Sequence, residues 1–348
     1  MINNNYHYHN MTRLLLITLI IFFSHPVISK EINLFTSRHY DSDFKLYKKF
    51  TQKTGIKVNV INGKSKVLEK RIYEEGKNSK ADVLFLADAG ALYSAQKKNL
   101  FTKIESKKIN NKLPKNLKND FWVAITKRAR VLFYNPEKIN KKDVQNISYE
   151  DLSNKRWKNS IAIRQANNIY NQSLIASILE YNGPKNTFIW LKDFVNNFVR
   201  SPQGNDRAQI LLVASGEAKL AIANTYYYAL MLSGKKGDDQ KKAAEKVKPI
   251  FPNQNNRGTH INISGAGILK NSPNKENSLK FIEFLLTNEA QTHICNNSFE
   301  FPVVDNVKTN SFIDKIGKNF KEDHTISLSI YGERQTEAFK LMKKAGWN

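Results

Sequence analysis

Residues 31–86 alternate apolar runs with helical patterns, and this alternation limits the fold more than any other feature of the sequence. Short apolar runs between polar segments predict buried strands, and apolar residues at helical spacing predict helices. The expected order is strand 31–35, helix 44–55, strand 56–61, helix 65–76 with Ser65 as its N-cap, and strand 81–86. This βαβαβ order is typical of a parallel sheet with helices on its faces. Ligands of such sheets bind beyond the carboxyl ends of the strands, where the polar loop 37–42 is expected.

A second set of alternating elements begins near residue 129. We expect strands at 129–134, 161–163 and 219–223, a loop at 168–171, and helices at 173–181, 187–199, 206–215 and after Thr225. The run 259–268 is predicted to be a strand that returns to the first unit. The sequence therefore predicts an α/β fold of two lobes, each a mostly parallel sheet flanked by helices, joined by crossing hinge strands. The expected division is 30–127 plus 251–300 for the first lobe and 128–250 plus 301–348 for the second.

Residues 1–29 have the pattern of a secretory signal peptide. An apolar run at 14–23 follows Arg13, and small or modest residues at 27–29 precede Lys30. The apolar run is shorter than the roughly 20 residues needed to span a bilayer, so an uncleaved anchor is the less favoured alternative. Met1 and Met11 both fit as the true start. We expect a soluble, exported mature protein.

The chain is strongly basic, with 55 Lys and Arg against 31 Asp and Glu and a formal net charge of +24. Such an excess can indicate nucleic acid or an anionic membrane surface as a partner. Because the lysines are scattered along the chain, we expect a basic, solvated surface with weak attraction to anionic headgroups and no nucleic-acid partner. The single cysteine, Cys295, excludes an internal disulfide and is expected to be a buried small side chain.

Tyrosines stand at the predicted helix starts. Residues 226–228 are three tyrosines in a row where strand 219–223 gives way to a helix, and Tyr40 and Tyr170 each lie just before a predicted helix. A deprotonated phenol is a hard, anionic oxygen ligand suited to Fe(III), and a helix N-terminus favours the phenolate by about 0.3–1 kcal/mol. Metal binding is therefore one interpretation. Ordinary packing of the ring, with a hydrogen bond from the hydroxyl, is the other.

Several longer segments stand in a fixed order along the chain. They are SRHY at 37–40, ADVL at 81–84 with DAG at 88–90, NTYY at 224–227, PNQN at 252–255, GTHINISGAG at 258–267 and PNKEN at 273–277. Together they resemble the periplasmic iron-binding proteins of bacterial ferric-iron ABC transporters, especially the Fut type known from cyanobacteria. The resemblance covers nearly the whole chain after residue 30.

This resemblance implies a two-lobed periplasmic-binding-protein fold of type II, with iron held between the lobes by tyrosines. The implied metal ligands are Tyr40 in the first lobe and Tyr170, Tyr226 and Tyr227 in the second. His39 matches a neighbouring histidine that the family does not always use as a ligand.

Three further positions bear on the implied site. Arg130 matches a basic residue near the site in the family, and Tyr228 matches an aromatic residue that packs outside the ligand set. Some members carry arginine where this chain has Leu230, so one source of positive charge is missing. Four phenolates leave a formal charge of −1 around Fe(III) and −2 around Fe(II), and the sequence leaves the preferred oxidation state open.

Other polar residues are interpreted as structural. His260 lies in a predicted interlobe strand and His293 on a predicted helix, and Asp82 and Asp88 are expected to act as caps. The sequence contains no nucleophile motif, phosphate-binding glycine loop or paired-cysteine metal motif. The chain is therefore not expected to be an enzyme.

The interpretation that best fits these features is an exported, monomeric solute-binding protein. It would capture ferric iron, with ferrous iron as a second possibility, in an interlobe cleft and deliver it to an inner-membrane ABC permease. Hinge motion would close the cleft. One alternative is a binding protein for an organic or oxyanion solute, and another is a basic protein that adheres to anionic envelope polymers.

Overall fold

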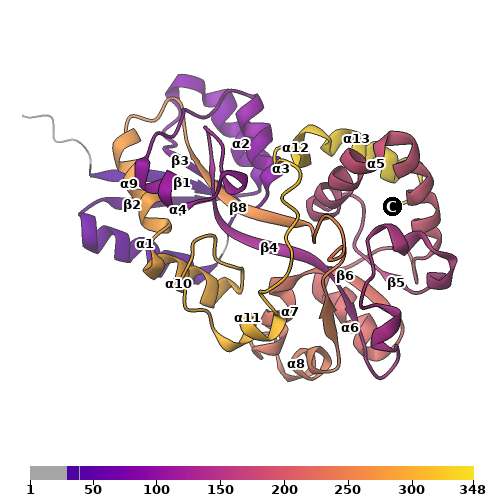
Figure 1. The fold of residues 1–348 in the computed structure, drawn as a ribbon. Coiled ribbons are helices and arrows are strands. Elements are labelled where there is room, and N and C mark those ends of the chain that lie inside the picture. The colour runs from indigo at the N-terminus through magenta and orange to yellow at the C-terminus, as the bar shows by residue number, and fades with distance from the viewer. Residues whose placement is uncertain (1–29, 39) are drawn as a thin grey trace, which may run out of the picture.

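A computed structural model describes residues 30–38 and 40–348. The expected signal peptide at 1–29, with both candidate start residues, and His39 lie outside the described residues. The described chain forms two lobes, and strands β4 (Val123–Tyr134) and β8 (Ile261–Ile268) run side by side between them (Figure 1). The two-lobed α/β architecture expected from the sequence is confirmed.

One mixed sheet runs through both lobes. Its other strands are β1 (Glu31–Thr36), β2 (Lys57–Asn62), β3 (Val83–Leu86), β5 (Ile161–Ala162), β6 (Leu220–Asn224) and β7 (Lys248–Ile250). The strand order is β2-β1-β3-β8-β4-β6-β5, and β7 also pairs with β4. The strands β1, β2 and β3 are parallel, as the βαβαβ pattern predicted. However, β4 runs antiparallel to β6, β7 and β8. The second lobe is therefore not mostly parallel as expected, because a crossing strand sets the direction of its neighbours.

The helices of the first lobe follow the predicted pattern. They are α1 (Asp41–Thr54), α2 (Ser65–Glu75), α3 (Ala89–Lys97), α4 (Lys107–Lys112), α9 (Lys275–Leu285) and α10 (Asn288–Ser298), with short 3-10 helices η1 (Gly76–Asn78) and η2 (Lys115–Leu117). Helix α1 buries Leu46, Tyr47 and Phe50 on one face. Ser65 is the first residue of α2 and makes no capping bond, so its predicted capping role is wrong.

The remaining helices lie mainly in the second lobe. They are α5 (Ile169–Asn196), α6 (Asp206–Ser215), α7 (Thr225–Leu232), α8 (Asp238–Glu245), α11 (Ser311–Ile316), α12 (Ile330–Glu333) and α13 (Gln335–Lys344), with η3 (Lys141–Asp143), η4 (Glu150–Ser153) and η5 (Lys155–Trp157). Helix α5 joins two predicted helices across a kink at Gly183, whose φ of 70° suits glycine. It starts at Ile169 because the Asn168 side chain accepts a hydrogen bond from the Tyr170 N–H. The expected loop at 168–171 is therefore the first turn of α5.

Buried apolar side chains form two hydrophobic clusters in the described chain. The larger cluster includes Phe35, Phe50 and Cys295, and burial raises the pKa of the Cys295 thiol, so this residue is the buried small side chain that was expected. The second cluster is rich in aromatic rings, among them Phe194 and Trp347 at 5.5 Å between centroids. Helix α12 contacts both α3 and α5 and so links the lobes at their surface.

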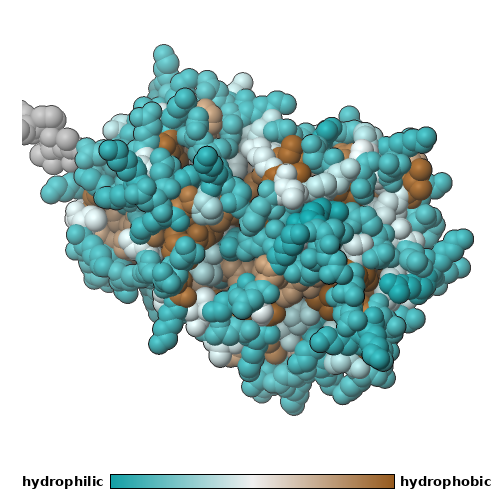
Figure 2. Space-filling model, viewed as in Figure 1, coloured by the Kyte–Doolittle hydropathy of each residue, from teal (hydrophilic) through white to brown (hydrophobic). Residues whose placement is uncertain are grey.

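Hydrophilic residues cover most of the visible face, and apolar residues show there in smaller, scattered patches (Figure 2). The described helices include none whose length and hydropathy would let it cross a membrane.

Candidate metal centre

Three helix starts carry the four tyrosines that the resemblance implied as ligands. Tyr40 directly precedes α1, with an extended backbone at φ −91° and ψ 124°. Tyr170 lies in the first turn of α5, and Tyr226 and Tyr227 lie in the first turn of α7. Unpaired N–H groups and the positive end of the helix dipole favour negatively charged oxygen at such positions. The predicted placement at helix starts is therefore confirmed.

A cavity of about 650 Å³ brings these four tyrosines together. Tyr40 comes from the first lobe, and Tyr170, Tyr226 and Tyr227 come from the second. The Tyr226 hydroxyl donates to the Tyr170 hydroxyl at 3.4 Å, and the rings of Tyr226 and Tyr227 lie 4.2 Å apart between centroids. The position of His39 relative to this cavity lies outside the description.

Three of the cavity phenols, those of Tyr40, Tyr226 and Tyr227, resist ionisation in the free protein. Burial raises the pKa of Tyr40 and of Tyr226 well above the ordinary tyrosine value, and it also raises the pKa of Tyr227. The neighbouring phenols, Tyr170 among them, raise the pKa of Tyr226 further because they repel a second negative charge. Three of the phenols are therefore protonated near neutral pH, and only a cation that binds oxygen strongly can displace their protons.

Arg130, which the resemblance placed near the site, supports the helix starts from behind. It does not line the cavity. Its guanidinium donates to the side-chain oxygens of Asn171 at 2.5 Å, Asn224 at 3.0 Å and Asp206 at 3.4 Å. Asn171 lies in the first turn of α5, and Asn224 directly precedes α7. One buried cation thus joins the two helix starts that carry Tyr170 and the 226–227 pair.

Arg128, which the sequence interpretation did not select, lines the cavity together with Arg38 and Arg207. Its guanidinium carbon lies 5.4 Å from the centroid of the Tyr170 ring. Burial acts to lower the pKa of Arg128, but neighbouring groups, the Glu300 and Asp88 carboxylates among them, raise it overall. Its Nη1 atom is buried without a hydrogen-bond partner among the described residues. Strand alternation offered a signal, because residues 128 and 130 of one strand share a face.

A buried ion pair forms another part of the wall. Arg38 binds Glu300 at 2.7 Å and Asp43 at 2.8 Å, and its guanidinium carbon lies 4.8 Å from the centroid of the Tyr40 ring. Burial acts to raise the pKa of Glu300, but Arg38 and Arg128 lower it overall. Glu300 is therefore a carboxylate in the wall that is already engaged by a cation. Arg38 and Glu300 are 262 positions apart in the sequence, so no local pattern could have predicted that they meet.

Positive charge also reaches the cavity from the second lobe. Leu230 lines the wall, as do Arg207, Lys235 and Lys236. The Arg207 side chain is bound to Gln240 at 2.9 Å. The positive charge that Leu230 does not supply is thus partly replaced by neighbouring residues.

The residues interpreted as structural lie outside the cavity wall. The Tyr228 hydroxyl donates to the Val247 carbonyl at 2.9 Å, in keeping with a packing role. The Asp88 carboxylate caps α3 by accepting from the N–H groups of Gly90 and Ala91, as expected.

The other three structural interpretations have mixed outcomes. His260 is buried, and its ring lies 4.6 Å from that of Tyr331. The His293 Nε2 atom lies 2.8 Å from the Ser42 carbonyl oxygen. Asp82 caps no helix and instead accepts from Asn33, Ser272 and Asn274, so its expected capping role is wrong.

The ligand atoms around the cavity limit which metal ions it could bind. Within 30–38 and 40–348, the His, Cys, Asp and Glu side chains form no group of three or more that could hold a metal ion. A metal in this cavity would depend on the phenol oxygens. Hard oxygen donors of this kind suit hard, highly charged cations better than soft ones.

The fold and the cavity together define a class of protein, a two-lobed binding protein whose pocket is lined by both lobes. Residues 45–324 match the bacterial extracellular solute-binding proteins, and the chain belongs to this family.

Known relatives show what similar chains do. The chain is 45% identical over 324 residues to iron uptake protein A1 of Synechocystis sp., covering 92% of this chain and 89% of that protein. The fold matches the Trichodesmium FutA structure in complex with iron and citrate with a TM-score of 0.87 and 46% identity, covering 91% and 100% of the two chains. It also matches the ferric binding protein of Campylobacter jejuni with a TM-score of 0.84 and 38% identity, covering 91% and 100%.

Proposed function

We propose that this protein binds ferric iron in the cavity between its lobes and delivers it to an ABC permease of the inner membrane. The observation that carries the proposal is the convergence of Tyr40, Tyr170, Tyr226 and Tyr227, from three helix starts and both lobes, on one cavity. Relatives named for iron uptake and ferric binding support the choice of cargo.

The four phenolates would be the principal ligands, and His39 would be a secondary one. Because imidazole is a softer ligand than phenolate, His39 would matter more for Fe(II) than for Fe(III). Arg130 would hold the helix starts in place. The unpartnered Nη1 of Arg128 would donate to an anionic oxygen accompanying the iron, such as that of citrate, which is present in the Trichodesmium structure.

The role in the cell follows from the same proposal. The segment 1–29 would direct export to the periplasm, where the protein would act as a monomer that binds its cargo without chemical conversion. The two lobes would be 30–127 plus 251–300 and 128–250 plus 301–348, and closure of one on the other would complete the site.

A visible spectrum, combined with metal analysis of protein purified without chelators, tests this function. Fe(III) bound to phenolate absorbs visible light by charge transfer, whereas an organic solute, an oxyanion or an envelope polymer gives no such band. We expect a coloured protein with about one iron per chain at saturation, as one cluster of four phenolates allows. A colourless protein after exposure to chelated ferric iron at neutral pH would contradict the proposal.

A further inference from the structure

The strands β4 and β8 separate at Arg130 and His260, and a tyrosine hydroxyl lies between them there. Their ladder ends at the pair Ala129 and Ile261. At the next position the Arg130 N–H donates to the His260 carbonyl at 3.1 Å. In an antiparallel pair of this type the His260 N–H would return a bond to the Arg130 carbonyl. Instead it donates at 3.3 Å to the Tyr149 hydroxyl, which itself donates to the Arg130 carbonyl at 2.5 Å.

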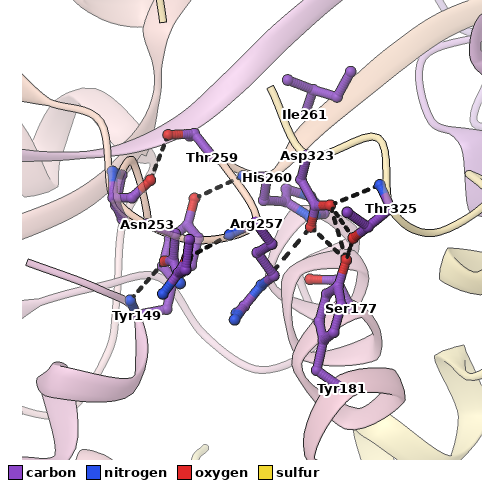
Figure 3. A network of polar contacts seen from close by, with 12 residues as sticks. Tyr149, Ser177, Tyr181, Asn253, Arg257, Thr259, His260, Ile261, Asp323 and Thr325 are labelled. Carbon is purple, nitrogen blue, oxygen red and sulfur yellow. Dashed lines mark hydrogen bonds and ion pairs between the residues drawn. The ribbon is translucent and has the colours of Figure 1, made fainter. Parts of the chain in front are cut away.

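Tyr149 is held firmly in this position. Its N–H donates to the Asn253 side chain at 2.9 Å, and the neighbouring Glu150 binds Arg257 at 2.6 Å. Only 1% of Tyr149 is exposed. Burial raises the pKa of its hydroxyl, which therefore keeps the proton that it donates. Figure 3 shows the ring reaching the His260 N–H beside these contacts.

A third segment crosses the hinge beside the two strands. The Thr259 N–H donates to the Lys321 carbonyl at 2.8 Å, and the Asp323 N–H donates to the Thr259 carbonyl at 2.9 Å. Gly258 permits this close approach, because a Cβ there would lie 2.7 Å from the Glu322 backbone. The Tyr181 hydroxyl of α5 donates to the Asp323 carboxylate at 2.8 Å, and Arg257 lies 3.8 Å from the same carboxylate (Figure 3). Tyr149, Arg257, Asp323 and Tyr181 are called the hinge cluster below.

The hinge cluster is connected to the cavity through Arg130 and α5. The backbone of Arg130 is held by Tyr149, and its side chain holds Asn171 at the start of α5. The same helix is attached to the crossing segment further along, through Tyr181 and Asp323. Helix α5 is therefore fixed to the hinge at two points, and its first turn carries Tyr170. A change at the hinge must change where Tyr170 lies relative to Tyr40 in the other lobe.

We infer that Tyr149 is a positioning residue for ferric iron, whose hydroxyl sets the separation of β4 and β8 and so holds the lobes of the free protein near the arrangement that binds. This inference rests on the proposed function. Removing the hydroxyl leaves a buried N–H and a buried C=O without their shared partner, which loosens the hinge at this point. The apparent dissociation constant rises in proportion as the binding arrangement becomes less populated.

The test compares Tyr149→Phe with Tyr228→Phe. Each removes one buried tyrosine hydroxyl bonded to a backbone carbonyl, but the Tyr228 bond to Val247 lies away from the hinge. Ferric affinity is measured by competition with citrate, and X-ray scattering gives the radius of gyration of the free and iron-loaded forms. We expect Tyr149→Phe to bind ferric iron roughly tenfold more weakly, to have a larger radius when free, and to keep the wild-type visible band when loaded. Tyr228→Phe should lower the melting temperature but leave affinity and radius unchanged.

An affinity and a free-state radius equal to wild type in Tyr149→Phe would overturn the inference and leave Tyr149 with a purely structural role. If Tyr149→Phe does not fold, Tyr181→Phe decides the question, since it removes the second attachment of α5 and should shift the same two quantities in the same direction. If the wild-type protein takes up no ferric iron, the proposed function fails by itself. The scattering of the free variants then decides the hinge role, and unchanged radii overturn it.

Discussion

Acidification should weaken ferric binding steeply, and the structure gives the size of the effect. Tyr40, Tyr226 and Tyr227 have pKa values raised above the ordinary value by burial, so all three phenols are protonated between about pH 6 and pH 8. Binding of these three residues as phenolates displaces at least three protons per iron. Each displaced proton changes the binding constant about tenfold per pH unit, so the three together give about a thousandfold, or about 4 kcal/mol, per unit.

Two measurements check this value. Competition with a chelator of known protonation, between about pH 6 and pH 8, gives the slope of the binding constant against pH. Calorimetry in buffers of different ionisation enthalpy counts the released protons directly. The variant Tyr226→Phe, if it still binds, should release one proton fewer than wild type. Release of fewer than three protons per iron, after correction for the chelator, would refute phenolate ligation by all three of these residues.

Three further predictions concern single side chains. Tyr226→Phe should weaken ferric binding by more than about a hundredfold, since losing a group that only supports a ligand already costs about 10–100-fold. The control variant Tyr228→Phe should bind as wild type. If competition gives Tyr226→Phe the same ferric affinity as wild type, Tyr226 is not a ligand. Arg130→Met should destabilise the free protein by about 3 kcal/mol in urea unfolding, because the buried Asp206 carboxylate loses a buried cation and keeps only the Asn224 N–H at 3.1 Å and Arg164 at 3.7 Å; an unchanged midpoint would contradict this. His39→Ala should reduce Fe(III) affinity far less than Tyr226→Phe does and should keep the visible band. It should reduce the affinity for Fe(II), measured anaerobically, more than the affinity for Fe(III). Equal small effects on both affinities would indicate a structural role for His39.

Local signals in the sequence predicted most of the fold. The βαβαβ order gave β1 to β3 with their helices because each element is defined by neighbouring residues. Two features depended on contacts that are distant in sequence. Strand β4 is longer than the apolar run at 129–134 because its first half pairs with β8. The sheet of the second lobe is mixed because β4 enters from the first lobe.

The same distinction between local patterns and distant contacts explains which residues of the candidate site could be predicted. The four tyrosines were predictable because helix starts and the NTYY segment are local patterns. The charged residues around them were harder to predict. Arg130 contacts Asp206, 76 positions away in the sequence, and Asn224, 94 positions away. Arg38 contacts Glu300, 262 positions away. No periodicity in a single sequence indicates which of many arginines will meet which carboxylate in the folded chain.

The charges around the cavity affect the balance between ferric and ferrous iron. Arg38 is paired with Asp43 and Glu300, and Arg130 with Asp206. Arg128 lies 3.9 Å from Asp88 and donates to the Ala87 carbonyl at 2.5 Å, and its Nη1 is unpartnered among the described residues. A buried cation of this kind is costly without a compensating anion. Four phenolates leave a formal charge of −1 around Fe(III) and −2 around Fe(II), so the positive charge of Arg128 attracts the ferrous complex more strongly than the ferric one. We therefore expect Arg128→Met to lose more affinity for Fe(II) than for Fe(III), and so to have a larger ferric preference than the wild-type protein. A ferric preference in Arg128→Met equal to or smaller than that of wild type, measured with Fe(III) and anaerobic Fe(II) at one pH, would contradict this account.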